Sequence, residues 1–183
     1  MCGDGDGVRK RRRVDHVRVG AELECLRGSL DGRREITRVG APVVLVTNQS
    51  AVGRGLLSEA DLGAIHQRMR NVISAAGGRI DAIYACLHTT GSGCDCRKPA
   101  PGLLKRAAVD LKLQIETSVL VGDSASDLEA AEAAGCAAIL VADERPNGLD
   151  PAVATVSDLR QAADGIARHA KRAPQWSMRA VVN

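Results

Sequence analysis

The sequence is almost without aromatic side chains. Among its 183 residues there are one Trp, one Tyr and no Phe, so a core has to be built from Val, Leu, Ile and Ala. Hydrophobic residues still make up 45% of the chain, which is enough for the core of a single domain. This composition is typical of buried parallel strands flanked by helices. The scarcity of aromatic rings also argues against nucleic acid as a partner, because single-strand binding normally uses rings as stacking platforms.

Long apolar runs are absent as well. No stretch approaches the roughly 18 apolar residues that a membrane span requires, and the N-terminus lacks the apolar segment of a signal peptide. We therefore expect a cytoplasmic protein with no membrane partner. We also expect a monomer. Cysteines in a reducing compartment are thiols or metal ligands more often than disulfides. Three of the six cysteines lie between positions 86 and 96.

A strong excess of charge of one sign is also missing, since the formal net charge is +3. Much of the positive excess lies in the basic run at positions 9–13. Such a run is usually a solvated segment, and the alternative is that it attracts an anionic ligand.

Strands and helices are predicted to alternate along the chain. Short apolar runs predict strands at 43–46, 80–86, 119–121, 137–141 and 153–156. Helical spacing and capping residues predict helices after Ser58, from Pro101, over 126–134 up to Gly135, and from a cap at Ser157 to about 170. This order predicts one α/β domain over residues 1–172, with a doubly wound parallel sheet, and a loose tail over 173–183. Ligands bind such sheets beyond the carboxyl ends of the strands.

Carboxylates that could serve phosphate chemistry lie in two segments. Asp4 and Asp6 are separated by one residue, so they could hold a divalent cation while one of them attacks phosphorus. The alternative is an ordinary Asp-Gly turn. Asp123 follows the apolar run 119–121 and could bind Mg²⁺, which prefers oxygen ligands. Asp127 could orient Lys98 or stabilise the loop, and the alternative is a first-turn helix charge.

Neutral and basic groups in two further segments could bind phosphate. Thr47 and Asn48 follow the apolar run 43–46, where a hydroxyl, an amide and loop N–H groups can meet phosphate oxygens. The alternative there is a turn rich in capping residues. Arg97 and Lys98 precede the helix from Pro101, and Lys98 could neutralise charge on a transferring phosphoryl group. The alternative is that both are ordinary surface residues.

A fifth segment combines Cys86-x-His88 with Cys94-x-Cys96. Three thiolates and one imidazole form the closed tetrahedral set of a structural zinc site. With no open position, such a zinc would organise a loop and would not activate water. The alternative is a group of incidental thiols. The other cysteines, at positions 2, 25 and 136, have no such neighbours and are interpreted as ordinary residues.

In chain order, these segments resemble the haloacid dehalogenase superfamily of phosphatases. The shared pattern is Asp-x-Asp-Gly, a strand ending in Thr-Asn, a Lys, and Gly-Asp-x-x-x-Asp. Within that superfamily, Thr-Asn-Gln-Ser, Gly-Arg-Gly, the two cysteine pairs and Arg-Lys-Pro-x-Pro-Gly look like the D-glycero-D-manno-heptose 1,7-bisphosphate 7-phosphatases. The related histidinol phosphatases share nearly the same pattern. The match covers about Asp4 to Gly135.

The resemblance implies a Rossmann-like fold with a minimal cap and a zinc-binding loop. It also implies an Mg²⁺-dependent phosphomonoesterase that acts on a small sugar phosphate through an aspartyl-phosphate. Asp4 would be the nucleophile, and Asp6 the general acid that protonates the leaving oxygen and later activates water. Asp123 would complete the magnesium site with Asp4 and the carbonyl of Asp6.

The remaining site residues are also carried over from the resemblance. Thr47 and Asn48 would hold the phosphoryl group, and Lys98 would offset its charge. Arg54 and Arg97 would be candidates for binding the second anionic group of the substrate.

The sequence departs from the family pattern mainly before Asp4. Three residues precede Asp4 here, whereas the family carries a hydrophobic central strand at that place. In addition, Ala51 replaces the usual Gly, and Ser124 stands where some members carry Lys. The leading hypothesis is hydrolysis of the 7-phosphate of a heptose bisphosphate. The alternative within the enzyme class is a histidinol phosphate phosphatase. The missing strand motivates a further hypothesis, a catalytically impaired binding protein stabilised by zinc.

Overall fold

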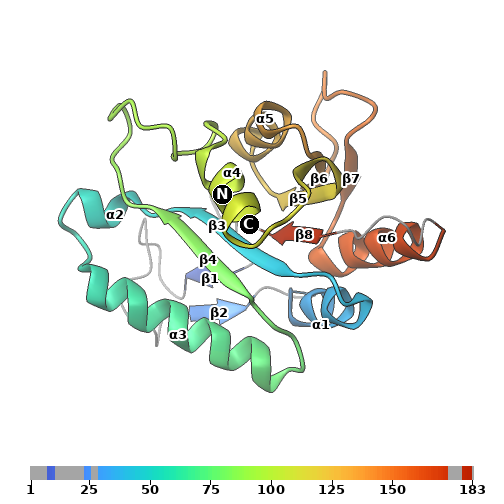
Figure 1. Cartoon of the computed structure of the whole chain (residues 1–183), viewed down its shortest axis with the longest axis horizontal. Coiled ribbons are helices and arrows are strands. Elements are labelled where there is room, and N and C mark those ends of the chain that lie inside the picture. Colours follow the sequence, from blue (N-terminus) through green and yellow to red (C-terminus); the bar gives the residue numbers. More distant parts are fainter. Residues whose placement is uncertain (1–7, 11–22, 26–28, 173–178, 183) are drawn as a thin grey trace.

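A parallel sheet of six strands, with helices on both faces, forms the body of the protein (Figure 1). The computed structural model describes residues 8–10, 23–25, 29–172 and 179–182. In spatial order the strands are β4 (Ala82–Cys86), β3 (Val43–Asn48), β8 (Arg179–Val182), β5 (Ser118–Gly122), β6 (Ala137–Val141) and β7 (Ala154–Val156). All neighbouring pairs are parallel. The predicted doubly wound α/β architecture is confirmed.

Alternate residues of β3 explain why helices cover both faces of the sheet. Val43 packs in one cluster with α1 (Ser29–Val39) and α6 (Leu159–Arg172), and Leu45 packs with α3 (Glu59–Ala75). Val44 and Val46 point the other way and pack against α4 (Gly102–Asp110) and α5 (Ala125–Ala134). A strand buried on both faces has to be continuously apolar, as this one is.

Helix ends lie close to the predicted positions. The Ser58 hydroxyl accepts a hydrogen bond from the N–H of Asp61 at 3.0 Å and caps α3 as predicted. Gly135 ends α5 with a φ of 82°, a conformation that glycine adopts without strain. The predicted cap at Ser157 is wrong by one residue. The Asp158 carboxylate accepts from the N–H of Gln161 at 2.9 Å, and the Ser157 hydroxyl accepts instead from the Gln161 side chain.

Helix α1 was not predicted from the sequence. Its core-facing side includes Arg33, which is 1% exposed, beside the buried Ile36. A buried charged residue breaks the apolar periodicity by which a helix is recognised. Helix α1 lies along α6 (Figure 1), and the two backbones approach closely at Gly32, where a Cβ would come within 2.7 Å of the Leu159 carbonyl.

A small antiparallel sheet pairs β1 (Val8–Lys10) with β2 (Leu23–Cys25). It was not predicted either, and β1 contains the first two residues of the basic run. The short helix α2 (Ser50–Gly53) and the 3₁₀ turn η2 (Ile115–Thr117) complete the described elements.

The prediction of a loose C-terminal tail is wrong for residues 179–182. They form β8, which enters the middle of the sheet between β3 and β5 (Figure 1). A run of three small or β-branched residues is too short to be recognised as a strand by itself. Its strand state comes from the two neighbours that pair with it. None of the helices that the structure describes has both the length and the apolar character needed to cross a membrane.

Candidate functional site

A buried ion pair lies where β3 and β5 end. The Nζ atom of Lys98 is 2.7 Å from Oδ1 of Asp127, and the side chains are 5% and 0% exposed. Lys98 Nζ also donates to the backbone carbonyl of Val46 at 2.9 Å. Burial of two charges is tolerated when they pair and their remaining polar atoms find hydrogen bonds. The ammonium is therefore held in place at the carboxyl edge of the sheet.

The second carboxylate oxygen of Asp127 organises the loop after β5. It accepts hydrogen bonds from the N–H groups of Asp123 and Ser124, at 3.2 and 3.1 Å, and from the Ser124 hydroxyl at 2.6 Å. Gly122 makes this approach possible, because a Cβ there would lie 2.6 Å from that oxygen. Asp127 thus performs both tasks that its sequence position suggested, orienting Lys98 and capping the first turn of α5.

Thr47 and Asn48 end β3 beside this pair. Asn48 exchanges two hydrogen bonds with the backbone of Lys98, since its Oδ1 accepts from the Lys98 N–H and its Nδ2 donates to the Lys98 carbonyl, both at 3.1 Å. The Thr47 hydroxyl accepts from Gln49 Nε2 at 3.2 Å. The sequence analysis gave Gln49 no role, although Gln49 lies two residues after Thr47 in the Thr-Asn-Gln-Ser motif.

Asp123 comes directly after β5 and is exposed at the edge of the sheet. Its carboxylate is the type of ligand that Mg²⁺ prefers. The structure therefore brings four predicted residues, Thr47, Asn48, Lys98 and Asp123, to one edge of the sheet. Asp4 and Asp6 lie outside the described residues, so their predicted roles as nucleophile, acid and metal ligands stay predictions.

The two arginines predicted to bind a second anion differ in their surroundings. Arg54 is exposed just after α2. Arg97 is half-buried, and its guanidinium donates to the backbone carbonyl of His88 at 3.4 Å. Arg97 is thus tied to the segment that contains the Cys and His residues.

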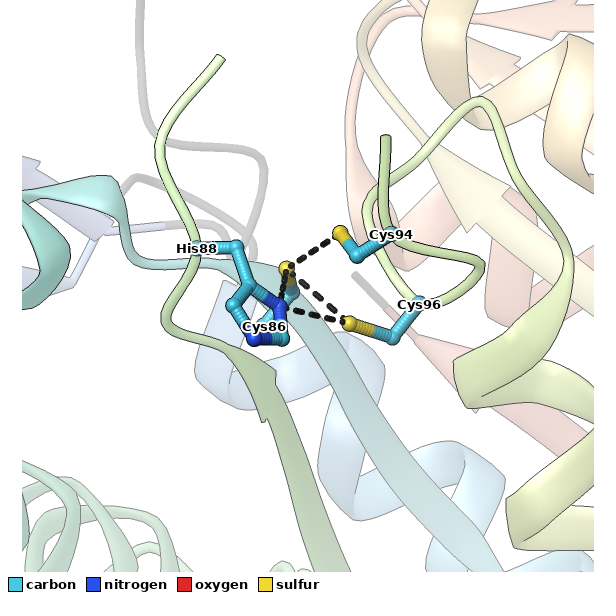
Figure 2. A group of neighbouring side chains, drawn as sticks. All are labelled: Cys86, His88, Cys94 and Cys96. Atoms are coloured by element: carbon cyan, nitrogen blue, oxygen red, sulfur yellow. Dashed lines mark hydrogen bonds between the residues drawn. The ribbon is translucent and has the colours of Figure 1, made fainter. Parts of the chain in front are cut away.

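The four predicted zinc ligands do converge (Figure 2). Cys86 ends β4, His88 follows it, and Cys94 and Cys96 come from the loop before α4. Their ligand atoms all lie within 4.8 Å of one another. The Sγ atom of Cys86 is 3.7 Å from that of Cys94 and 3.2 Å from that of Cys96, and His88 Nδ1 is 3.2 Å from the Cys96 sulfur.

These distances suit a metal ion. Sulfur ligands at 2.3 Å from a tetrahedral zinc are about 3.8 Å apart, so the thiol group needs little rearrangement to bind one. Hydrogen bonding by Ser92 is the main cause that lowers the pKa of Cys94 to about 6, whereas burial is the main cause that raises the pKa of Cys96 to about 12. Without metal, one thiol is therefore ionised at neutral pH while another keeps its proton.

A family model described as HAD-hydrolase-like matches residues 95–164. The chain is 41% identical over 138 residues to D-glycero-beta-D-manno-heptose-1,7-bisphosphate 7-phosphatase of Bordetella bronchiseptica, covering 75% of this chain and 77% of that enzyme. It is 36% identical over 156 residues to D-glycero-alpha-D-manno-heptose-1,7-bisphosphate 7-phosphatase of Mycobacterium bovis, covering 80% of each.

A solved structure with a similar fold is that of D,D-heptose 1,7-bisphosphate phosphatase from B. bronchiseptica, complexed with magnesium and phosphate. The TM-score is 0.79 at 35% identity, over 90% of this chain and 95% of that one. The similarity thus extends well beyond the region matched by the family model.

Proposed function

The chain belongs to the haloacid dehalogenase-like hydrolases, and from this premise we propose that it hydrolyses the 7-phosphate of D-glycero-D-manno-heptose 1,7-bisphosphate. The observation that carries the proposal is the buried Lys98–Asp127 pair beside Thr47 and Asn48, in a chain similar to enzymes of that name. The pair places a fixed positive charge where a phosphoryl group would meet the sheet edge.

In this proposal, the carboxyl groups of Asp4 and Asp6 carry out the chemical steps. A carboxylate oxygen of Asp4 forms a bond to phosphorus, the bond from phosphorus to the sugar oxygen breaks, and Asp6 gives a proton to the leaving oxygen. Water then attacks phosphorus and gives its proton back to Asp6, which releases phosphate and frees Asp4.

The other site residues bind and orient the phosphate in this scheme. Thr47 donates its hydroxyl proton to a phosphate oxygen, and Lys98 offsets the charge on the transferring group. Asp123, Asp4 and the carbonyl of Asp6 would hold Mg²⁺, which supplies further charge compensation when bound. Arg54 and Arg97 would bind the substrate's second phosphate, where an Arg fork suits phosphate geometry.

We assign the group Cys86, His88, Cys94 and Cys96 to a structural Zn²⁺, on the basis of its donor set and spacing. The ion would fix the loop that leads into Lys98, and it would leave no position open for substrate. Thiol ligands of this kind fit a reducing compartment, which supports a cytoplasmic location. We also propose that the protein is a monomer, which a sedimentation measurement would test.

The test is phosphate release by the purified full-length protein. With magnesium, heptose 1,7-bisphosphate should lose its 7-phosphate and retain its 1-phosphate, and Asp4→Asn should abolish turnover while the zinc content is unchanged. Comparing both anomers would identify the preferred one. Faster turnover of histidinol phosphate would favour the alternative enzyme function. A folded, zinc-containing protein with no turnover of any sugar phosphate would favour the binding protein.

A further inference from the structure

Gln49 comes directly after the strand end that carries two of the predicted phosphate-binding residues. It occupies the N-cap position of α2, where the side chains of Ser, Thr, Asp and Asn usually accept from the free N–H groups of a helix. The Gln49 side chain makes no capping hydrogen bond. Its amide is turned back toward the end of β3 instead, where it donates to Thr47.

The hydrogen bond between Gln49 and Thr47 has a defined direction. Nε2 of Gln49 donates to Oγ1 of Thr47 at 3.2 Å. Side chains two residues apart in an extended strand lie on the same face, which brings these two groups together. A hydroxyl has one proton and two lone pairs. A hydroxyl that accepts from Gln49 therefore keeps its own proton for another partner.

The hydroxyl of Thr47 lies in an enclosed position. The residue is 4% exposed, and within the described ranges no group accepts its hydroxyl proton. A buried donor without an acceptor costs free energy. A phosphate oxygen at the sheet edge would supply the acceptor, and the bond from Gln49 would keep the proton directed toward it.

The backbone of Gln49 is fixed on two sides. Its N–H donates to the carbonyl of Cys86 at 2.7 Å, and its carbonyl accepts from the N–H of Val52 at 3.2 Å. Helix α2 also lies so close to the segment after β4 that a Cβ at Gly53 would collide with the Leu87 carbonyl. The amide of Gln49 therefore extends from an anchored backbone, as a positioning group requires.

We propose that Gln49 is a positioning residue of the phosphate site, whose amide orients the Thr47 hydroxyl so that the hydroxyl proton is donated to phosphate. Gln49 makes no contact with the phosphate in this proposal and acts through Thr47. The inference rests on the proposed function, which assigns Thr47 to phosphate binding. It differs from a purely structural role in what happens to the effect of Gln49 once the hydroxyl is removed.

A double-mutant cycle tests whether Gln49 acts through Thr47. Gln49→Met removes the donor and keeps the length of the side chain. It should weaken the binding of inorganic phosphate, measured by calorimetry with magnesium, by about tenfold. Thr47→Val removes the hydroxyl and should weaken binding by about 10- to 100-fold. In the Thr47→Val background, Gln49→Met should change the phosphate Kd by less than about twofold. Equal effects of Gln49→Met in both backgrounds would overturn the inference.

A second substitution tests the direction of the hydrogen bond. Gln49→Glu puts an oxygen that only accepts in place of Nε2, so the Thr47 proton would turn to the carboxylate and be lost to phosphate. Repulsion between Glu and phosphate is present whether or not residue 47 carries a hydroxyl. Gln49→Glu should therefore weaken phosphate binding by a factor about tenfold larger with Thr47 than in the Thr47→Val background. The same factor in both would contradict the proposed orientation.

Gln67→Met is the matched control for Gln49→Met. The Gln67 amide donates to the side chain of Asn71 at 2.9 Å on the exposed face of α3, so phosphate affinity should stay within about twofold of the wild type. Thermal unfolding checks that each variant is folded. Thr47→Ala provides a second background without the hydroxyl if Thr47→Val does not fold.

The combination of binding and turnover separates this inference from the proposed function. Coupling between Gln49 and Thr47 in phosphate binding, with no turnover of heptose bisphosphate by the wild type, would reject the proposed function and keep the positioning role. Turnover together with independent effects of the two residues would keep the proposed function and reject the positioning role. Absence of phosphate binding by the wild type would also overturn the inference.

Discussion

Asn48 and Lys98, fifty positions apart, exchange two hydrogen bonds of 3.1 Å between one side-chain amide and one peptide backbone. These bonds hold the end of β3 against the loop that follows the Cys and His residues. Asn is suited to this because its amide offers a donor and an acceptor at once. The amide of Asn48 therefore determines where the Lys98 side chain begins.

Replacing Asn48 by Ala should remove both bonds. The N–H and carbonyl of Lys98 would lose their partners in a partly buried position, so the free energy of unfolding should fall by about 1–3 kcal/mol. Phosphate release should fall as well, because Lys98 would be less well placed. Denaturant titration measures the first effect. Asn71→Ala is the matched control, since Asn71 accepts one exposed bond from Gln67, and its effect should be within about 0.5 kcal/mol.

Replacing Lys98 by Met should leave the carboxylate of Asp127 buried without its cation. We expect a loss of about 3–5 kcal/mol of stability and a fall in kcat of about 100-fold. The double variant Lys98→Met, Asp127→Asn should recover part of the stability and none of the activity, because Asn removes the buried charge and keeps an oxygen that can accept the hydrogen bonds of the loop. A double variant no more stable than Lys98→Met alone would contradict this.

The matched control is the exposed pair Arg106–Asp110, whose charged atoms are 3.6 Å apart with side chains 72% and 46% exposed. Arg106→Met should change the free energy of unfolding by less than about 1 kcal/mol. Both pairs join a cation to an aspartate, so the contrast isolates the effect of burial.

Gly122→Ala should disturb the loop after β5. The new Cβ would lie 2.6 Å from the Asp127 oxygen that accepts three hydrogen bonds, so the loop or α5 has to move. We expect the free energy of unfolding, measured by calorimetry, to fall by about 1–3 kcal/mol. Phosphate release should fall by a larger proportion than this stability. At Gly63, in α3, a Cβ meets nothing within 4 Å. Gly63→Ala should raise stability by about 0.5–1 kcal/mol.

The affinity for zinc should depend on pH, because the thiols have to lose their protons to bind the metal. Above pH 6 Cys94 is ionised, because its pKa is lowered to about 6, so it releases no proton when metal binds. Below pH 6 Cys94 is protonated, and one further proton has to leave. Below pH 6 the logarithm of zinc affinity should therefore fall by about one unit more per pH unit in the wild type than in Cys94→Ser, which lacks this proton. Titration against a coloured chelator measures this.

Cys136→Ser provides the control for the metal titration. Burial raises the pKa of Cys136 to about 11, and this residue is not among the four that converge. Its removal should leave both the affinity and its pH dependence unchanged. A change as large as that caused by Cys94→Ser would argue that the metal binds elsewhere.

Local patterns were sufficient where local physics determines the structure. The apolar run of β3, the Ser58 cap and the Gly135 stop were all predicted, and so was the convergence of Cys86 with the later cysteine pair. The order of the motifs along the chain predicted which of these strands would meet at one edge. Because parallel strands end at the same edge of the sheet, Thr47 and Asp123 lie at that edge although they are far apart in the sequence.

Other features depend on tertiary contacts and could not be predicted in this way. Helix α1 buries Arg33, which a hydrophobic pattern treats as a surface residue. The bonds between Asn48 and Lys98 join residues that have no local relationship. Strand β8 is short and pairs with strands whose sequences lie far before it, so its partners, and not its composition, determine its structure.

The central position of β8 bears on the order of events during synthesis. The hydrophobic faces of β3 and β5 are made long before the residues that lie between them in the finished sheet. Until those residues emerge, β3 and β5 each have one edge that is not yet paired with β8. Unpaired strand edges promote association between chains. The final closure of the sheet should therefore be a late and highly non-local event in folding.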